Sequence, residues 1–214
     1  MPFKDFGIEE ARSSDLNTYL MNQMVITCTS STRPSSPVTG MRIWETNTSV
    51  EWVWDGTAWR VIGGFPQIAY KPVIETVTNS TTVQDDDHLS LPVAANATYV
   101  VEALVRVYAP RAADCRVSWS APSGNSFNWV THAPHTNMTD PRATTISVNA
   151  FNAATSGADI GGDQEDLWPT HAFIKGLLQT TSAGTFTLRW AQTSANGTGS
   201  SVLDRSYLQL IRVA

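Results

Sequence analysis

The feature that most constrains the fold is the segment Tyr99–Tyr108, in which Val101, Ala103, Val105 and Val107 fall on one face and Glu102 and Arg106 on the other. Side chains of a β-strand point alternately to opposite faces, so a period of two predicts a half-buried strand. A second segment, Thr185 to Ala191, repeats the pattern, with Phe186, Leu188 and Trp190 on one face. We therefore expect a chain built from strands rather than helices.

Residues 67–214 contain about eight such segments, a number that fits a two-sheet jelly roll. The predicted strands are Val73–Thr78, Tyr99–Tyr108, Cys115–Ser120, Ser126–Thr131, Thr144–Phe151, Ala172–Gln179, Thr185–Ala191 and Tyr207–Val213. Only 15% of the 214 residues are charged, which argues against a coiled coil or helical bundle. The 8 Trp, 7 Phe and 5 Tyr argue against disorder, because so much ring area needs a core.

The first 40 residues have a different character and are predicted to form an arm. Apolar side chains at helical spacing follow a possible N-cap at Ser13 or Ser14. They form one stripe, Leu16, Tyr19, Leu20 and Met24. The segment Thr29–Pro37 contains two prolines and small polar residues, which indicates an extended linker.

Residues 41–66 are predicted to form a small β-meander that carries half of the tryptophans: Trp44, Trp52, Trp54 and Trp59. Asp55-Gly56 between two apolar runs is a strong hairpin signal. So small a sheet buries little by itself, so we expect the tryptophans to dock it onto a neighbouring chain. The alternative is that they stack on sugar rings.

Charge and terminal sequence exclude several classes of function. The net charge is −5 and the pI about 5.3, which does not favour nucleic-acid binding. No apolar run is long enough to span a membrane, and Met1–Asp5 lacks the features of a signal peptide. We therefore expect a protein made in a cytoplasm, with Cys28 and Cys115 reduced.

No motif predicts catalysis, a cofactor or a metal. His132 and His135 are interrupted by Pro134, and we interpret them as loop residues. Asp85-Asp86-Asp87-His88 is interpreted as a solvated turn. The acidic residues Asp159, Asp163, Glu165 and Asp166 lie in a long predicted loop, Asn152–Pro169, without the spacing of a calcium loop. We therefore expect no enzyme.

Two stretches resemble virion proteins of tailed bacteriophages. Asp15–Val25 (DLNTYLMNQMV), then Arg33-Pro34, Gly40 and Trp54–Trp59 (WDGTAW), resembles their N-terminal module, except that Trp54 stands where Tyr is commoner. Gly184–Gln192 followed by Ser206–Leu210 is similar to the end of phage β-sandwich head-fibre, decoration and minor tail proteins, and Asp114–Gly124 to the middle of the same family.

The resemblance implies a homotrimer of TNF-like jelly rolls that binds a major capsid protein or other virion proteins. We expect the sandwich, residues 67–214, to trimerise through Phe186, Trp190, Tyr207 and Leu208. The arm and the tryptophan module would seat the trimer on the shell as a decoration or head-fibre protein. The alternative is a minor tail or baseplate protein that binds a host-surface glycan through the Asn152–Pro169 loop and Trp129.

Overall fold

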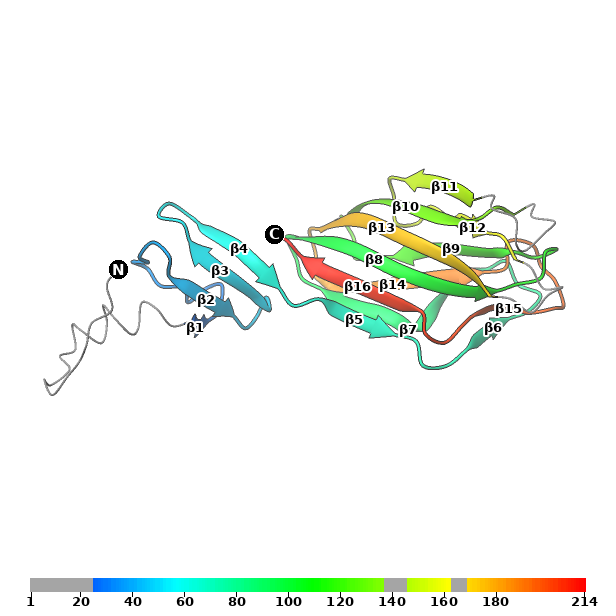
Figure 1. Ribbon diagram of the computed structural model, residues 1–214, viewed down its shortest axis with the longest axis horizontal. Coiled ribbons are helices and arrows are strands. Elements are labelled where there is room, and N and C mark those ends of the chain that lie inside the picture. Colours follow the sequence, from blue (N-terminus) through cyan, green and yellow to red (C-terminus); the bar gives the residue numbers. More distant parts are fainter. Residues whose placement is uncertain (1–24, 137–145, 163–168) are drawn as a thin grey trace, which may run out of the picture. The chain divides into compact units, whose positions relative to one another are not determined.

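The chain folds into two compact units, which meet in sequence between Phe65 and Pro66. The computed structural model describes residues 25–136, 146–162 and 169–214 (Figure 1). All regular secondary structure in these residues is β-strand, so the predicted all-β class is confirmed. The helix predicted over Leu16–Met24 lies outside the described residues. No helix among the described residues could cross a membrane.

The first unit is a four-stranded sheet in the order β1-β2-β3-β4. Its strands are β1 (Val25–Cys28), β2 (Arg42–Glu45), β3 (Val50–Trp54) and β4 (Trp59–Gly64). The predicted arm therefore ends too late, because β1 pairs in parallel with β2 and brings residues 25–40 into this unit. The expected three-stranded meander is correct for β2, β3 and β4, which pair antiparallel.

The predicted hairpin at Asp55-Gly56 is confirmed. Asp55 Oδ1 accepts hydrogen bonds from the backbone N–H groups of Thr57 and Ala58, each at 2.7 Å. Gly56 has a φ of 103°, a conformation that a residue with a Cβ rarely adopts. The side chain of Asp55 thus closes the turn that the sequence pattern predicts.

The second unit is a sandwich of two sheets. One sheet begins with the strands β11-β10-β13-β8. Two strands pair with the free edge of β8, β16 along one part and β15 along another. β5 then pairs with β16, and β6 pairs with β15. These strands are β5 (Gln67–Tyr70), β6 (Glu75–Val77), β8 (Ala97–Tyr108), β10 (Ser126–Pro134), β11 (Ile146–Phe151), β13 (Thr170–Thr180), β15 (Ser200–Val202) and β16 (Tyr207–Arg212). The other sheet has the order β12-β9-β14-β7. Its strands are β7 (Gln84–Val93), β9 (Cys115–Ser120), β12 (Ala158–Ile160) and β14 (Gly184–Ala191).

The strand order is that of a jelly roll, which confirms the predicted architecture. The strands β5-β16-β8-β13 form one sheet and β7-β14-β9-β12 the other, so the chain crosses repeatedly between the sheets (Figure 1). The hairpin β10–β11 is inserted between β9 and β12 and widens the first sheet.

The core between the sheets is aromatic. The ring of Trp119 on β9 stacks on Phe186 of β14 at 4.7 Å, and Phe127 of β10 stacks on Trp129 at 6.0 Å. Phe186, Trp190 and Leu208 are fully buried within one chain. Their predicted place in a trimer interface is therefore wrong, because the interior of the sandwich already uses their surface.

A buried ion cluster links the two sheets. Lys71, directly after β5, is fully buried, and its Nζ lies 2.7 Å from Asp86 of β7 and 2.9 Å from Glu75 of β6. The backbone N–H groups of His88 and Leu89 also donate to Asp86. The segment Asp85–His88 is thus part of a strand, and the predicted solvated turn is wrong.

Candidate functional site

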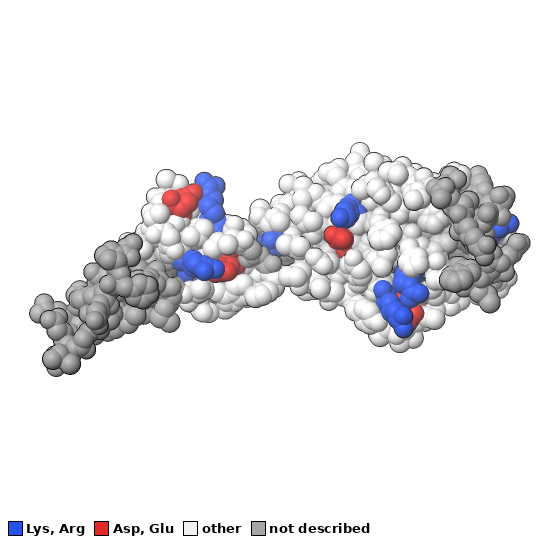
Figure 2. Space-filling view, in the orientation of Figure 1, with Lys and Arg blue, Asp and Glu red and all other residues white. Residues whose placement is uncertain are grey.

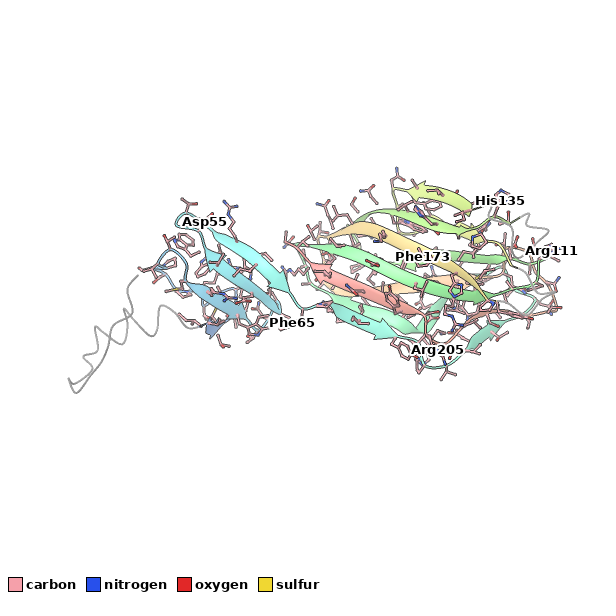
Figure 3. The ribbon with its side chains drawn as sticks, viewed as in Figure 1. Asp55, Phe65, Arg111, His135, Phe173 and Arg205 are labelled. Carbon is pink, nitrogen blue, oxygen red and sulfur yellow. The ribbon has the colours of Figure 1, made fainter. Side chains whose placement is uncertain are left out.

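In the sandwich, the sheet that contains β8 and β13 carries a broad set of exposed apolar side chains on its outer side, which we call the apolar face. Its exposed members are Ile68, Tyr70, Val100, Ile146, Val148, Phe173 and Leu177, each between 41% and 63% accessible. They alternate along their strands with buried residues such as Ile174 and Leu178, so they point away from the core. Figure 3 labels Phe173 on β13.

Strand register assembles these side chains into two rows. In the first row Phe173 lies opposite Leu104, Leu104 opposite Tyr207, and Tyr207 opposite Tyr70. In the second row Leu177 lies opposite Val100, which lies opposite Ile211. Tyr207 is the one residue of the predicted trimer interface that the structure places on this face. Contiguous rows across several strands make a patch rather than scattered exposed residues.

Few charges interrupt the apolar face. Lys175 and Glu102 lie between the two rows, 3.7 Å apart, and both are exposed. Arg106 lies near one end and contacts Asp204 at 3.4 Å. Figure 2 shows how little charge the sandwich presents in this view. An apolar face with a small neutral pair at its centre suits contact with another protein surface better than contact with water.

A pocket of about 360 Å³ lies at one end of the apolar face. Its lining comes from β10, β11 and β13 and includes His132, His171, Thr170, Phe173 and Ile146. Burial lowers the pKa of His171, and the charge of Arg106 lowers it further. His171 therefore favours its neutral form, in which one ring nitrogen donates and the other accepts a hydrogen bond.

The outward side of the second sheet is polar, and we call it the polar face. Strands β7, β14 and β9 point hydroxyls and charges outward here: Asp85, Ser90, Arg116, Ser118, Thr185, Thr187 and Arg189. Ser90 Oγ and Thr187 Oγ1 share a hydrogen bond of 2.8 Å. Ser118 and Thr187 are nevertheless buried among their neighbours, and the other side chains give the face the polar composition that is typical of a sheet face in contact with water.

The four tryptophans of the first unit do not form one docking patch. Register places Trp52, Trp54 and Trp59 on one side of the sheet and Trp44 on the other. Trp54 and Trp59 contact each other edge to face at 5.5 Å, and Trp44 contacts Phe65 in the same way at 5.3 Å. All four are half-buried. Docking of this module onto another chain stays a prediction. A single docking surface could include Trp52, Trp54 and Trp59 but not Trp44, which lies on the other side of the sheet.

Arg33, which belongs to the N-terminal motif of the phage resemblance, has a structural role in the first unit. The guanidinium of Arg33 lies 4.2 Å from the centre of the Trp52 ring and pairs with the fully buried Glu45. Thr48 Oγ1 donates to the second oxygen of Glu45 at 2.8 Å. Arg33 thereby fastens the segment before β2 across the sheet. The predicted anchoring residues Leu16, Tyr19, Leu20 and Met24 lie outside the described residues.

Other sequence candidates are placed as follows. His132 lies in β10, so its predicted place in a loop is wrong. No group of three or more possible metal ligands occurs in the described parts of the chain. Trp129 is 3% exposed and donates to the carbonyl of Ala153, so it cannot stack on a sugar. Cys28 and Cys115 are both free thiols, as predicted, and burial raises the pKa of Cys115. The long predicted loop contains an edge strand, β12, which pairs with β9.

Comparisons with known proteins do not place the chain in a family. No family model matches it, and no curated protein matches it. Among solved structures, a structure of the infectious bursal disease virus Gx strain is 9% identical with a TM-score of 0.17, and the VP2 subviral particle of that virus is 8% identical with a TM-score of 0.18. The chain is covered to 75% but spans less than half of either match, 42% and 44%. Likeness at this level carries no argument about function.

The apolar face was not predicted, although the sequence contains a signal for it. In β13, Phe173 is followed by Ile174, and Leu177 by Leu178. Paired apolar residues put apolar side chains on both faces of a strand, which is typical of strands that are covered on both sides. The rows across strands, in contrast, depend on the register, which single-strand patterns do not contain.

Proposed function

We propose that this chain is a structural, non-enzymatic protein of a virus surface, in a tailed-phage particle, and that it self-associates as a homotrimer through the apolar face. The observation that carries the proposal is the apolar face itself. A face of this kind marks a protein–protein interface or a ligand groove. The resemblance of the N-terminal and C-terminal motifs to phage virion proteins is the reason for proposing a phage particle and a trimer.

Self-association is favoured over a different partner by the charges on the face. Lys175 and Glu102 give it one charge of each sign at its centre, so Lys175 of one copy can meet Glu102 of the next in a heterologous contact. Completing the burial of each of these half-exposed side chains contributes roughly half of the 1.5–3 kcal/mol that full burial provides. A heterologous contact that closes after three copies gives a ring with no open end, as the proposal requires.

The proposed attachment to the particle uses the N-terminal residues. The stripe Leu16, Tyr19, Leu20 and Met24 and the tryptophan module would contact the major capsid protein or another virion protein. Three linked chains raise the effective concentration of the second and third contacts to roughly the millimolar range. A bound trimer that bridges shell subunits would stabilise the assembled state by mass action.

Light scattering of the full chain tests the self-association. We expect a mass three times the 23.3 kDa of one chain. Leu177→Glu puts a charge in the apolar face and should give a monomer, whereas Thr185→Glu on the polar face should not. A wild-type chain that stays monomeric at high concentration would contradict the proposal.

Particle measurements test the location. A copy number comparable with that of the shell protein supports decoration, and a loss of heat resistance on deletion supports stabilisation. Leu20→Asp should release the protein from particles while the sandwich stays folded. Retention at wild-type occupancy would place the anchor elsewhere.

The second candidate is binding of a host-surface glycan by a minor tail or baseplate protein. The pocket of His132, His171 and Phe173 favours it, because an aromatic ring and convergent polar groups suit a sugar ring. This pocket is open to a glycan only if the apolar face is uncovered. Lost adsorption to cells with unchanged heat resistance of particles would support this candidate over decoration.

A further inference from the structure

Four charged side chains cross the polar face in one row, which we call the charged row. It consists of Asp159 on β12, Arg116 on β9, Arg189 on β14 and Asp85 on β7. Asp159 lies directly opposite Arg116, and Arg189 directly opposite Asp85. The signs along the row therefore run negative, positive, positive, negative.

The two arginines occupy neighbouring central strands. Arg189 lies opposite Ser118, which is two residues from Arg116 on the same face of β9. Diagonal neighbours of this kind are within reach of long side chains, and like charges so placed repel each other. The carboxylates lie on the outer strands, so they do not separate the guanidiniums. The centre of the row is therefore locally positive.

Each guanidinium has a carboxylate on its outer side, and Arg116 is hydrogen-bonded to its carboxylate. Arg116 donates through Nε and Nη2 to the two oxygens of Asp159, at 2.7 and 3.1 Å, and Thr193 donates to the same carboxylate. Arg189 lies 2.8 Å from Asp85 and donates to the carbonyl of Val83. Of the five N–H groups of Arg116, three remain for other acceptors.

The space beside the two guanidiniums is a recess of about 230 Å³. Arg116, Arg189, Ser118, Thr155, Gly157 and Val83 line it. Gly157 closes one wall so tightly that a Cβ there would lie 3.0 Å from Cδ of Arg116. The arginine side chains are 42% and 34% exposed, so a ligand from solution can reach them.

We propose that this recess binds the oxyanion of an acidic sugar, a carboxylate or a phosphate. Planar guanidiniums match the oxygens of both groups. Two hydrogen bonds to Asp159 orient the guanidinium of Arg116 before a ligand arrives, and Asp85 lies against that of Arg189. The hydroxyls of Ser118 and Thr155 suit the remaining polar part of a sugar. The four charges of the row sum to zero, so the empty site is stable. The inference does not rest on the proposed self-association, because it uses the opposite sheet.

Calorimetric titration of the full chain at constant ionic strength tests the site with three probes: methyl glucuronide, glucose 1-phosphate and glucose. We expect saturable binding of at least one acidic sugar with a Kd in the millimolar range, and no binding of glucose. The preferred acidic probe identifies the source of the oxyanion. No saturation by either acidic sugar at about 50 mM, well above a millimolar Kd, would overturn the proposal.

Variants separate this site from general attraction of anions. Arg189→Gln should weaken binding at least tenfold, and Arg205→Gln, with the same charge change at an exposed arginine beside Asp204, should not. Gly157→Ala changes no charge but displaces Arg116, and should weaken binding several-fold even if Arg189→Gln unfolds. Equal affinity in wild type, Arg189→Gln and Gly157→Ala, with thermal unfolding confirming the folded state, would overturn the proposal.

Discussion

The two outer faces of the sandwich differ, although the strands beneath them follow the same rule. Strand β13 points Phe173 and Leu177 outward, and β14, the next strand in the chain, points Thr185, Thr187 and Arg189 outward. Their inward residues are alike, with Ile174 and Leu178 in one and Phe186 and Leu188 in the other, all fully buried.

The difference shows that folding alone does not set the composition of the outer faces. Both strands satisfy the core equally, so the apolar residues of the first face are not needed to hold one chain together. A sheet face that meets only water is usually polar, as the second face is. The contrast therefore separates residues that serve the fold from residues for which we propose contact with other molecules.

The largest expected effect comes from the ion cluster that joins the two sheets. Lys71→Met leaves Asp86 and Glu75 without their cation, and breaking a buried pair in this way costs about 3–5 kcal/mol. Urea unfolding should show this loss. Lys175→Met, the same change on the exposed apolar face, should alter the free energy of unfolding by less than about 0.5 kcal/mol. Similar losses for both variants would contradict the structural role of Lys71.

The second largest effect tests directly whether the apolar face, and not the polar face, governs self-association. Leu177→Glu should weaken self-association about tenfold or more, because it loses the remaining apolar burial of a side chain that is 42% exposed and places an unpaired charge in the contact. Sedimentation over a range of concentrations measures the change. Thr185→Glu on the polar face is the matched control. Equal weakening by both variants would mean that charge, not the apolar face, governs association.

A third effect concerns pH and lies on neither face. Burial, with a smaller contribution from the charge of nearby Asp159, raises the pKa of Asp114 to about 6, although a hydrogen bond from the backbone N–H of Gly162 opposes the shift. The folded chain thus binds a proton that the unfolded chain, with an ordinary Asp pKa near ~3.9, releases. Stability should therefore rise as the pH falls from about 6 to 4.

Asp114→Asn should remove this dependence. At pH 7.5 the variant should be more stable than wild type by about 2–3 kcal/mol, and near pH 4 the two should agree. Asn also tolerates the φ of 52° at this position. Thermal unfolding across the pH range checks the difference between the two proteins. A constant difference at every pH would show that the Asp114 carboxyl is not the titrating group.

The smallest effect tests the polar face. Thr187→Val removes the hydrogen bond to Ser90 and should cost about 0.5–1.5 kcal/mol of stability. The mass in solution should not change, because one added methyl group does not make this face apolar. Chemical denaturation and light scattering on the same sample check both points. A change in mass would mean that the polar face also takes part in assembly.

The strands that the sequence predicts best are those with clean alternation. Cys115–Ser120 is predicted to the residue, and Thr185–Ala191 starts one residue late. Strand β7 is missed because Asp85, Asp86 and Asp87 are typical of turns. Their place in a sheet depends on Lys71 and Arg189, which reach them only after folding.

The interaction sites were harder to predict for the same reason. Phe186 and Trp190 are large and apolar, and sequence pattern alone does not distinguish a core position from an interface position. The charged row could be predicted only by knowing how the four strands pair residue by residue. A partial signal was present, since Arg116, Asp159 and Arg189 are isolated charges, and opposite charges on neighbouring strands tend to pair.

The position of β16 has a consequence for how the chain reaches its fold. β16 lies between β8 and β5, and Tyr207 pairs with both Leu104 and Tyr70. During synthesis the ribosome makes β5 and β8 long before β16, so both wait with open backbone edges. The sheet closes only when this late strand inserts, and such long-range pairing is slow. A nascent chain stopped before Tyr207 would expose those edges, and would be a target for proteolysis rather than a smaller version of the protein.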